Sequence, residues 1–417
     1  MSDIKVQANV SKQASFQMAI LDTNLKNNAL KAVATALEAN KDYIFEANNR
    51  DLDNAVKDGL EGPLVKRLKF DEHKLSDVIA GIKSLIGLED PVGKVKLHTT
   101  LDDGLELYRV TCPIGVIGII FESRPDALVQ ISTLCLKSGN SVFLKGGREA
   151  LETNKALYSV IKKASIEAGL PDGWINLLET RDDVSEMLTL NEYIDLIIPR
   201  GSNSFVQYIM NNTLIPVMGH ADGVCHTYVD VDADIEKAMD IVVDAKTQYV
   251  SVCNATETVL INKSLDNLAK GEIVKALEDH GVRIHFEDDV TEWHHEYLDY
   301  DVSIKFVETV DDAINHINKY GSGHTEAIIT ENKETAEYFM NKVDASSVML
   351  NASTRFADGF RYGFGAEVGV STSKLHARGP VGLEGLISYK YKIYGNGNIV
   401  ADYASGKKTF KHIRREV

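Results

Sequence analysis

One cysteine has the setting of a catalytic nucleophile. Cys253 lies in the segment 249–258, between a predicted helix over 235–246 and an apolar, β-branched run over 258–261. On such a short connection a thiol can face a cleft, and its thiolate form is a strong nucleophile. On this residue alone, a small apolar core residue is an equally open interpretation. A nucleophilic Cys253 requires an acyl substrate and a group that acts on the acyl-enzyme.

Two glycine-containing turns have the pattern of phosphate-binding loops. The turn at 145–148 follows an apolar strand and opens a helix, and the turn at 199–203 does the same. Glycines let backbone amides approach a phosphate, and a helix N-terminus favours an anion. A solvated basic loop and an ordinary N-cap are the alternatives. Two such turns in one alternating region favour a nucleotide site.

Basic residues gather at predicted strand ends in a chain that is acidic overall. The 45 Lys and Arg face 61 Asp and Glu, which gives a net charge of −16. Arg124 ends the first apolar strand, where open α/β sheets bind ligands. Arg355, Lys374 and His376 lie in two later segments rich in hydrogen-bond donors. These four residues are the candidate ligands of an anionic substrate, although Arg124 could instead pair with Asp126.

The order of the predicted elements indicates an α/β fold with two doubly wound parallel sheets. Residues 12–90 read as helices, including one over 15–40, and 95–110 as a hairpin around Asp102-Asp103-Gly104. Strand-helix alternation begins at 114, and the boundary between the two alternating sets is expected near Val231. The second set has predicted strands at 258–261, 282–285, 326–330 and 347–350, and helices at 311–319 and 333–342.

Composition narrows the class of protein. At 417 residues, 44% hydrophobic and 25% charged, the chain is typical of a soluble protein with about two or three domains. No apolar run approaches the roughly 20 residues of a membrane helix. The first residues lack the features of a secretory signal, so we expect a cytoplasmic protein. The negative charge argues against nucleic acid as a partner.

Neither a metal site nor a disulfide framework is predicted. The four cysteines stand far apart without a CxxC pair, which favours a reducing compartment. Cys112, Cys135 and Cys225 are most simply small apolar residues. His294 and His295 are adjacent and would not face one site on a helix.

Taken together, several segments resemble the aldehyde dehydrogenase superfamily, and more closely its gamma-glutamyl phosphate reductases. The resemblance runs from about residue 14 to residue 397, and its most specific segments are 113–118, 122–125, 252–258, 351–356 and 374–380. Several long matches in the right order make chance agreement improbable.

The resemblance implies roles for the residues at matching positions. Cys253 matches the acyl-accepting cysteine, and Asn254 and Ser123 complete the implied catalytic set. Ser123 stands where the superfamily has an oxyanion asparagine, so the backbone N–H of Cys253 is a further candidate donor. His220 stands where oxidising members carry the glutamate that activates water, and its presence fits a reductase. The implied cofactor-binding residues are Lys145, Gly147, Arg148, Gly201, Ser202 and Glu296.

The implied reaction is the NADPH-dependent reduction of L-glutamyl 5-phosphate to L-glutamate 5-semialdehyde, the second step of proline synthesis from glutamate. Arg148 suits the 2′-phosphate of NADPH better than the hydroxyls of NADH. The implied division is an NADPH-binding domain over 1–93 and 114–230, a catalytic domain over 231–384, and oligomerisation strands and tail over 94–113 and 385–417. A homo-oligomer and a functional contact with glutamate 5-kinase follow. The alternatives are an aldehyde or acyl-phosphate dehydrogenase for another substrate, and a non-catalytic binding relative.

Overall fold

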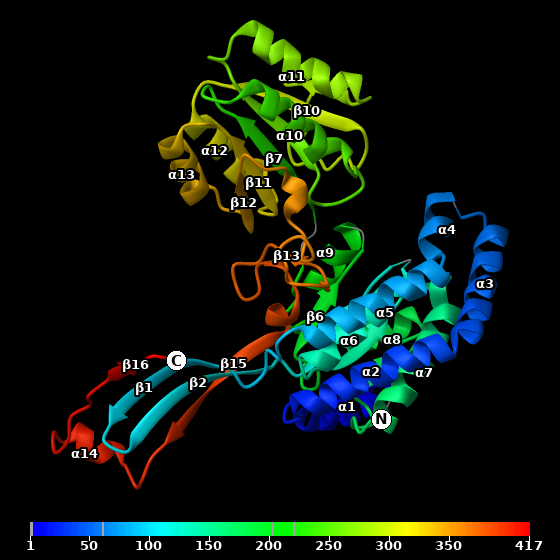
Figure 1. Cartoon of the computed structure of the whole chain (residues 1–417), viewed down its shortest axis with the longest axis vertical. Coiled ribbons are helices and arrows are strands. Elements are labelled where there is room, and N and C mark those ends of the chain that lie inside the picture. The colour runs from blue at the N-terminus through cyan, green and yellow to red at the C-terminus, as the bar shows by residue number, and fades with distance from the viewer. Residues whose placement is uncertain (1–2, 61, 123, 202, 220–221) are drawn as a thin grey trace.

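The chain forms two α/β units and a projecting β flap (Figure 1). This computed structural model describes residues 3–60, 62–122, 124–201, 203–219 and 222–417. Within those ranges, no helix is long and apolar enough to cross a membrane.

The first unit has a parallel sheet of four strands in the order β5-β4-β3-β6. Every residue of its strands β3 and β4 is buried, as the apolar sequence of these strands predicts. The strands are β3 (Val116–Ile120), β4 (Ser141–Lys145), β5 (Ile175–Leu177) and β6 (Leu196–Pro199). The helices are α1 (Asp3–Met18), α2 (Thr23–Ala39), α3 (Lys41–Lys57), α4 (Gly62–Leu68), α5 (Glu72–Gly87), α6 (Pro125–Lys137), α7 (Leu151–Glu167), α8 (Arg181–Met187) and α9 (Asn203–Asn211).

The expected helix over 15–40 is two helices. Asp22 accepts a hydrogen bond from the N–H of Leu25 at 2.8 Å and so starts α2 as its N-cap. A side chain that caps a new helix start interrupts a run that otherwise has helical spacing.

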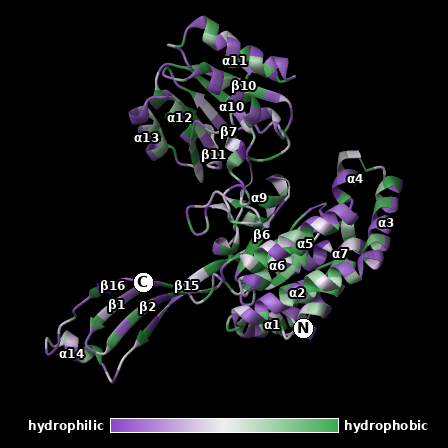
Figure 2. Cartoon of the chain, viewed as in Figure 1, coloured by the Kyte–Doolittle hydropathy of each residue, from purple (hydrophilic) through white to green (hydrophobic). Residues whose placement is uncertain are grey.

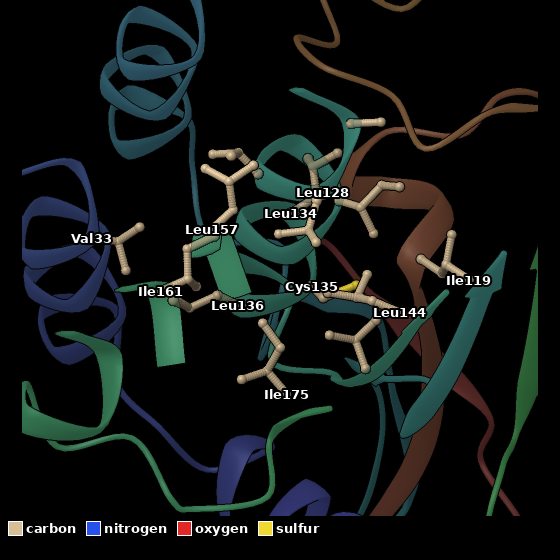
Figure 3. Packing of buried hydrophobic residues seen from close by; sticks show 14 of the residues in the cluster. Val33, Ile119, Leu128, Leu134, Cys135, Leu136, Leu144, Leu157, Ile161 and Ile175 are labelled. Atoms are coloured by element: carbon tan, nitrogen blue, oxygen red, sulfur yellow. The ribbon is translucent and has the colours of Figure 1, made fainter. Parts of the chain in front are cut away.

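Helix α6 is buried on nearly all sides between the sheet and the outer helices. Its Leu128, Leu134 and Leu136 pack with residues of β4 and α7 (Figure 3). Cys135 lies in the same core, where burial raises the pKa of its thiol. This cysteine is the small apolar residue that its sequence context predicts.

The second unit has a parallel sheet of six strands in the order β12-β11-β7-β8-β10-β9. Because β7 belongs to this sheet, the chain changes sheets before Cys225, earlier than the predicted boundary near Val231. The strands are β7 (Cys225–Val229), β8 (Thr256–Asn262), β9 (Arg283–Phe286), β10 (Asp301–Val307), β11 (Thr325–Ile329) and β12 (Ser347–Leu350). The helices are α10 (Ile235–Thr247), α11 (Asn267–Asp279), α12 (Val310–Tyr320) and α13 (Lys333–Lys342).

The flap is an antiparallel sheet in the order β15-β2-β1-β16. Strands β1 (Val95–Asp102) and β2 (Leu105–Pro113) form the predicted hairpin, and Gly104 takes a φ of 69° at its tip. Strand β15 (Ile387–Tyr394) pairs with β2, and β16 (Ile413–Arg415) pairs with β1. Hydrophobic and hydrophilic residues both run along these strands (Figure 2). Short elements complete the chain: η1 (Arg148–Ala150), η2 (Thr354–Phe356), β13 (Val370–Ser371), β14 (Gly379–Pro380), η3 (Leu383–Leu386) and α14 (Val400–Ala404).

Candidate active site

Cys253 lies on the loop that connects α10 to β8, at an edge of the six-stranded sheet. The residue is half-buried, and a turn closes around it because the N–H of Ala255 donates to the carbonyl of Val252 at 3.1 Å. No described residue accepts a hydrogen bond from the N–H of Cys253 or of Asn254. Both N–H groups can therefore point at a developing oxyanion.

Gly223 packs directly on the backbone of Cys253. A Cβ placed on Gly223 would lie 2.1 Å from the carbonyl oxygen of Cys253 and 2.4 Å from its Cα, so only glycine fits. The N–H of Gly223 donates to Oε1 of Glu296 at 3.0 Å. The structure thus brings Glu296, an expected cofactor ligand, close to the nucleophile.

Asn254 connects the cysteine loop to the turn η2. Its side chain is buried, and Nδ2 donates to the carbonyl of Ala357 at 2.9 Å. Its Oδ1 has no hydrogen-bond partner among the described residues. Asn254 therefore fixes the loop beside Arg355, which belongs to η2.

Two guanidinium groups, which follow strands of different sheets, lie close enough to Cys253 for its charge to affect their pKa values. Arg355 is buried, and its Nε donates to Oε1 of Gln248 at 3.0 Å. Burial lowers the pKa of Arg355, and the neighbouring Arg361 lowers it further, whereas the charge of Cys253 raises it. Arg200 follows β6 of the other sheet. Burial and Arg124 lower the pKa of Arg200, whereas Glu367 and Cys253 raise it.

Arg200 is a candidate site residue that the sequence interpretation did not include. A usable signal exists, because Arg200 directly follows a parallel strand, where ligands bind in open α/β sheets. The sequence interpretation assigned the neighbouring Gly201 and Ser202 to the cofactor. It gave no role to the charge of Arg200.

The other candidate substrate ligands are placed differently. Arg124 is half-exposed and its Nη2 donates to Asp126 at 3.1 Å, yet its charge still reaches Arg200. Lys374 is exposed and forms an ion pair with Asp344. His376 donates through Nε2 to the carbonyl of Ile387 at 2.8 Å. The contacts of Lys374 and His376 do not bring them to Cys253.

The turn after β4 carries two basic residues, Lys145 and Arg148. Lys145 is buried, its Nζ donates to the carbonyl of Gly146, and burial lowers its pKa. Gly147 lies against the carboxyl group of Glu149, because a Cβ placed there would be 1.9 Å from its Oε1. The side chain of Arg148 is exposed and forms no ion pair with a described residue.

In the turn after β6, a Cβ on Gly201 would lie 2.9 Å from Cδ of Glu122. Ser123, Ser202 and His220 lie outside the described residues. Within the described part of the chain, no group of three or more His, Cys, Asp or Glu side chains could hold a metal ion.

Comparison with known proteins places this fold and site in one class. The profile of the aldehyde dehydrogenase family matches residues 2–292, more than half of the chain. A loop cysteine just before a strand of one parallel sheet, with an arginine directly after a strand of the other, is consistent with that class.

Individual relatives narrow the class. A "Gamma-glutamyl phosphate reductase" from Acetivibrio thermocellus is 61% identical over 415 residues, which cover 96% of each chain. The protein of the same name from Ruminiclostridium cellulolyticum is 60% identical over 424 residues, 99% of this chain and 98% of the relative. The crystal structure of the Thermotoga maritima protein of that name is 40% identical, has a TM-score of 0.92, and aligns over 95% of this chain and all of its own. The chain therefore belongs to the aldehyde dehydrogenase family and, within it, to the gamma-glutamyl phosphate reductases.

Proposed function

We propose that this chain reduces L-glutamyl 5-phosphate to L-glutamate 5-semialdehyde and phosphate with NADPH, the second step of proline biosynthesis from glutamate. The observation that carries the proposal is a half-buried cysteine whose backbone N–H is unbonded among the described residues, on a loop that Asn254 ties to the turn carrying Arg355. An acyl phosphate brings a dianionic leaving group to the nucleophile, and paired guanidinium groups suit phosphate oxygens. The names of the relatives support the glutamyl group as the acyl part.

In the first half-reaction, the thiolate of Cys253 attacks the acyl carbon. The bond from that carbon to the phosphate oxygen then breaks, and phosphate leaves with the electron pair. The product is a glutamyl thioester on Cys253. Arg200 and Arg355 stabilise the leaving phosphate, and the N–H groups of Cys253 and Asn254 face the oxyanion. Each donor to such an oxyanion is typically worth about 10²–10³ in rate.

The first unit supplies residues that fit NADPH. Lys145 and Arg148 flank a glycine turn at the carboxyl end of β4, and Gly201 forms the adjacent turn after β6. The exposed guanidinium of Arg148 suits a 2′-phosphate. Glu296 is the proposed ligand of the nicotinamide ribose. When bound there, NADPH would supply the hydride that converts the thioester to the tetrahedral oxyanion of a thiohemiacetal.

The last step regenerates the nucleophile. The tetrahedral oxyanion collapses to a carbonyl as its carbon–sulfur bond breaks, which releases the aldehyde and leaves the electron pair on the Cys253 thiolate. Because Cys253 is only half-buried, the thioester must be protected from water until it is reduced.

We also propose a homo-oligomer that assembles through the flap and acts in the cytoplasm. Tyr389, Tyr391 and Ile393 are all more than half exposed on β15 and share one strand face. A functional contact with glutamate 5-kinase would limit the loss of a reactive acyl phosphate to water.

The reverse reaction tests the proposed function. The wild-type protein should reduce NADP⁺ with glutamate 5-semialdehyde over many turnovers only when phosphate is present, and much more slowly with aldehydes of other carbon skeletons. Equal rates with unrelated aldehydes, or rates independent of phosphate, would assign another substrate or another reaction.

A further inference from the structure

A fully buried ion pair connects the two ends of the loop that carries Cys253. Lys246 lies in the last turn of α10 and Glu257 near the start of β8, so the pair joins the two ends of the loop that carries Cys253. Nζ of Lys246 lies 2.8 Å from Oε2 of Glu257, and both side chains are 0% exposed. Such a pair is weak evidence for stability, because desolvation offsets the attraction between the charges. Its place in the fold therefore calls for another explanation.

The second oxygen of Glu257 holds a distant segment. Oε1 accepts from the N–H of Leu298 at 3.3 Å, and Leu298 has a φ of 55°, in the left-handed region that a leucine rarely adopts. The carbonyl of Leu298 in turn accepts from the hydroxyl of Ser251 at 3.2 Å. Both backbone groups of Leu298 therefore bind the nucleophile loop or its buried flank.

The same segment carries Glu296, two residues earlier. Glu296 accepts from the N–H of Gly223, and Gly223 lies against the backbone of Cys253. Between these anchors, Tyr297 hydrogen-bonds Ser303 at 2.9 Å and places its ring centroid 6.0 Å from Nζ of Lys246. The segment 296–298 is thus fixed against the cysteine loop at both ends.

We propose that Glu257, which is paired with Lys246, is a positioning residue: its carboxyl oxygen holds the amide of Leu298 and thereby fixes the Cys253 loop and Glu296 in one mutual geometry. The part of this inference that concerns the cofactor depends on the proposed function. Glu257 does not touch the reacting atoms and acts through Leu298.

Two double variants separate the hydrogen bond from the charge. Lys246→Met/Glu257→Gln removes both charges but keeps an amide oxygen that can accept from Leu298. Lys246→Met/Glu257→Leu has a side chain of similar size at 257 and no acceptor. A matched control is Lys26→Met/Asp90→Asn, because Lys26 and Asp90 form another buried pair, 2.9 Å apart, in the first unit.

Three quantities are measured on the folded variants: the rate of Cys253 alkylation by iodoacetamide, the dissociation constant of NADPH, and kcat. The Gln variant and the control should stay within about threefold of wild type, and the Leu variant should lose about tenfold or more in kcat and in NADPH affinity. Alkylation of the Leu variant should also be slower. Equal values for the Gln and Leu variants would overturn the proposal.

Two further results keep the outcomes distinct. Alkylation needs neither substrate nor cofactor, so it tests the fixed loop even if the wild-type protein fails to reduce glutamyl phosphate. If the Leu variant does not fold, Ser251→Ala provides the test, because this exposed residue makes the other bond to Leu298. We expect its alkylation rate to fall about threefold or more; an unchanged rate would contradict the role of Leu298.

Discussion

At the scale of single residues, the candidate site is positively charged although the whole chain is negatively charged. The protein carries a net charge of −16, yet Arg200 and Arg355 both lie close enough to Cys253 for its charge to affect their pKa values. Local cations of this kind concentrate an anionic substrate and stabilise charge as it develops. They come from different sheets, so neither unit alone provides both.

Replacing Arg200 should impair acyl transfer selectively. We expect Arg200→Met to lower kcat/KM for glutamyl phosphate about 10²-fold, because one of two cations at the leaving phosphate is lost. NADPH affinity should change little. Steady-state kinetics with Arg50→Met as control checks this, since Arg50 pairs with Glu46 on the surface of α3. Equal losses in both variants, or none in Arg200→Met, would remove Arg200 from the site.

The buried carboxyl of Glu257 should make stability depend on pH. Burial raises its pKa from 4.5 to about 7, although Lys246 and the N–H of Leu298 lower it and Glu296 raises it slightly. The folded protein therefore holds this proton to higher pH than the unfolded chain does. Protonated Glu257 therefore contributes about 3 kcal/mol to the free energy of unfolding. This contribution is fully present below pH 4.5 and is lost as pH rises through about 7.

Denaturant unfolding between about pH 5 and pH 8 checks this dependence. The free energy of unfolding of the wild type, relative to Lys246→Met/Glu257→Gln, should decrease as pH rises. Parallel curves for the two proteins would show that Glu257 titrates normally in the fold.

At the scale of elements, short connections at strand ends build the site. The loop after α10 carries Cys253, the turns after β4 and β6 carry the basic and glycine positions, and η2 carries Arg355. Rigid parallel strands hold these connections, so small backbone groups determine how closely they approach one another.

Gly223 lies directly against the backbone of the Cys253 loop, where two connections approach each other closely. Gly223→Ala should displace the Cys253 loop, because the new Cβ would lie 2.1 Å from a backbone oxygen, and acyl transfer should fall about 10²-fold. The matched control is Gly271→Ala in α11, where a Cβ meets nothing within 4 Å. Single-turnover kinetics should show a loss only for Gly223→Ala; full activity in that variant would mean that the loop position does not matter.

The sequence predicts those elements whose signals are local. The apolar strands β3 and β4, the Gly104 hairpin and helix α13 are found where hydrophobic spacing and turn residues place them. Strands β7 and β10 are not predicted, because they contain buried polar residues such as His226, Thr227 and Ser303. Tertiary hydrogen bonds stabilise those residues in the sheet, and no sequence window reveals them.

The site follows the same division. Motif and strand-end position make Cys253 and Arg355 candidates for the site, and the structure places them on loops joined by Asn254. The hydrogen bonds from Gly223 to Glu296 and from Leu298 to Glu257 join residues 73 and 41 positions apart. Contacts at such separation depend on how the complete unit folds and have no pattern in the sequence.

At the scale of the whole molecule, the flap is the part that lacks its own core. It projects from the two α/β units, and its β15 edge exposes Tyr391 and Ile393 at 56% and 61% (Figure 1). An exposed apolar edge strand is a ready surface for another chain. This exposure supports assembly of copies through the flap.

Charges on that face should weaken assembly. We expect Tyr391→Asp/Ile393→Asp to shift the protein to a smaller species in light scattering after size-exclusion chromatography. Val56→Asp on α3 introduces the same charge at another exposed apolar residue and should leave the size unchanged. An identical size for the flap variant and the wild type would place the interface elsewhere.

The central claim is that Cys253 carries the glutamyl group, and trapping that group tests it most directly. The protein is mixed with glutamate 5-semialdehyde and NADP⁺ without phosphate, quenched in acid and analysed by mass spectrometry of its peptides. We predict NADPH formation equivalent to the number of sites, with a glutamyl adduct on the peptide that contains Cys253 and none in Cys253→Ser. The same NADPH formation with an unmodified Cys253, or with the adduct on another residue, would contradict the account.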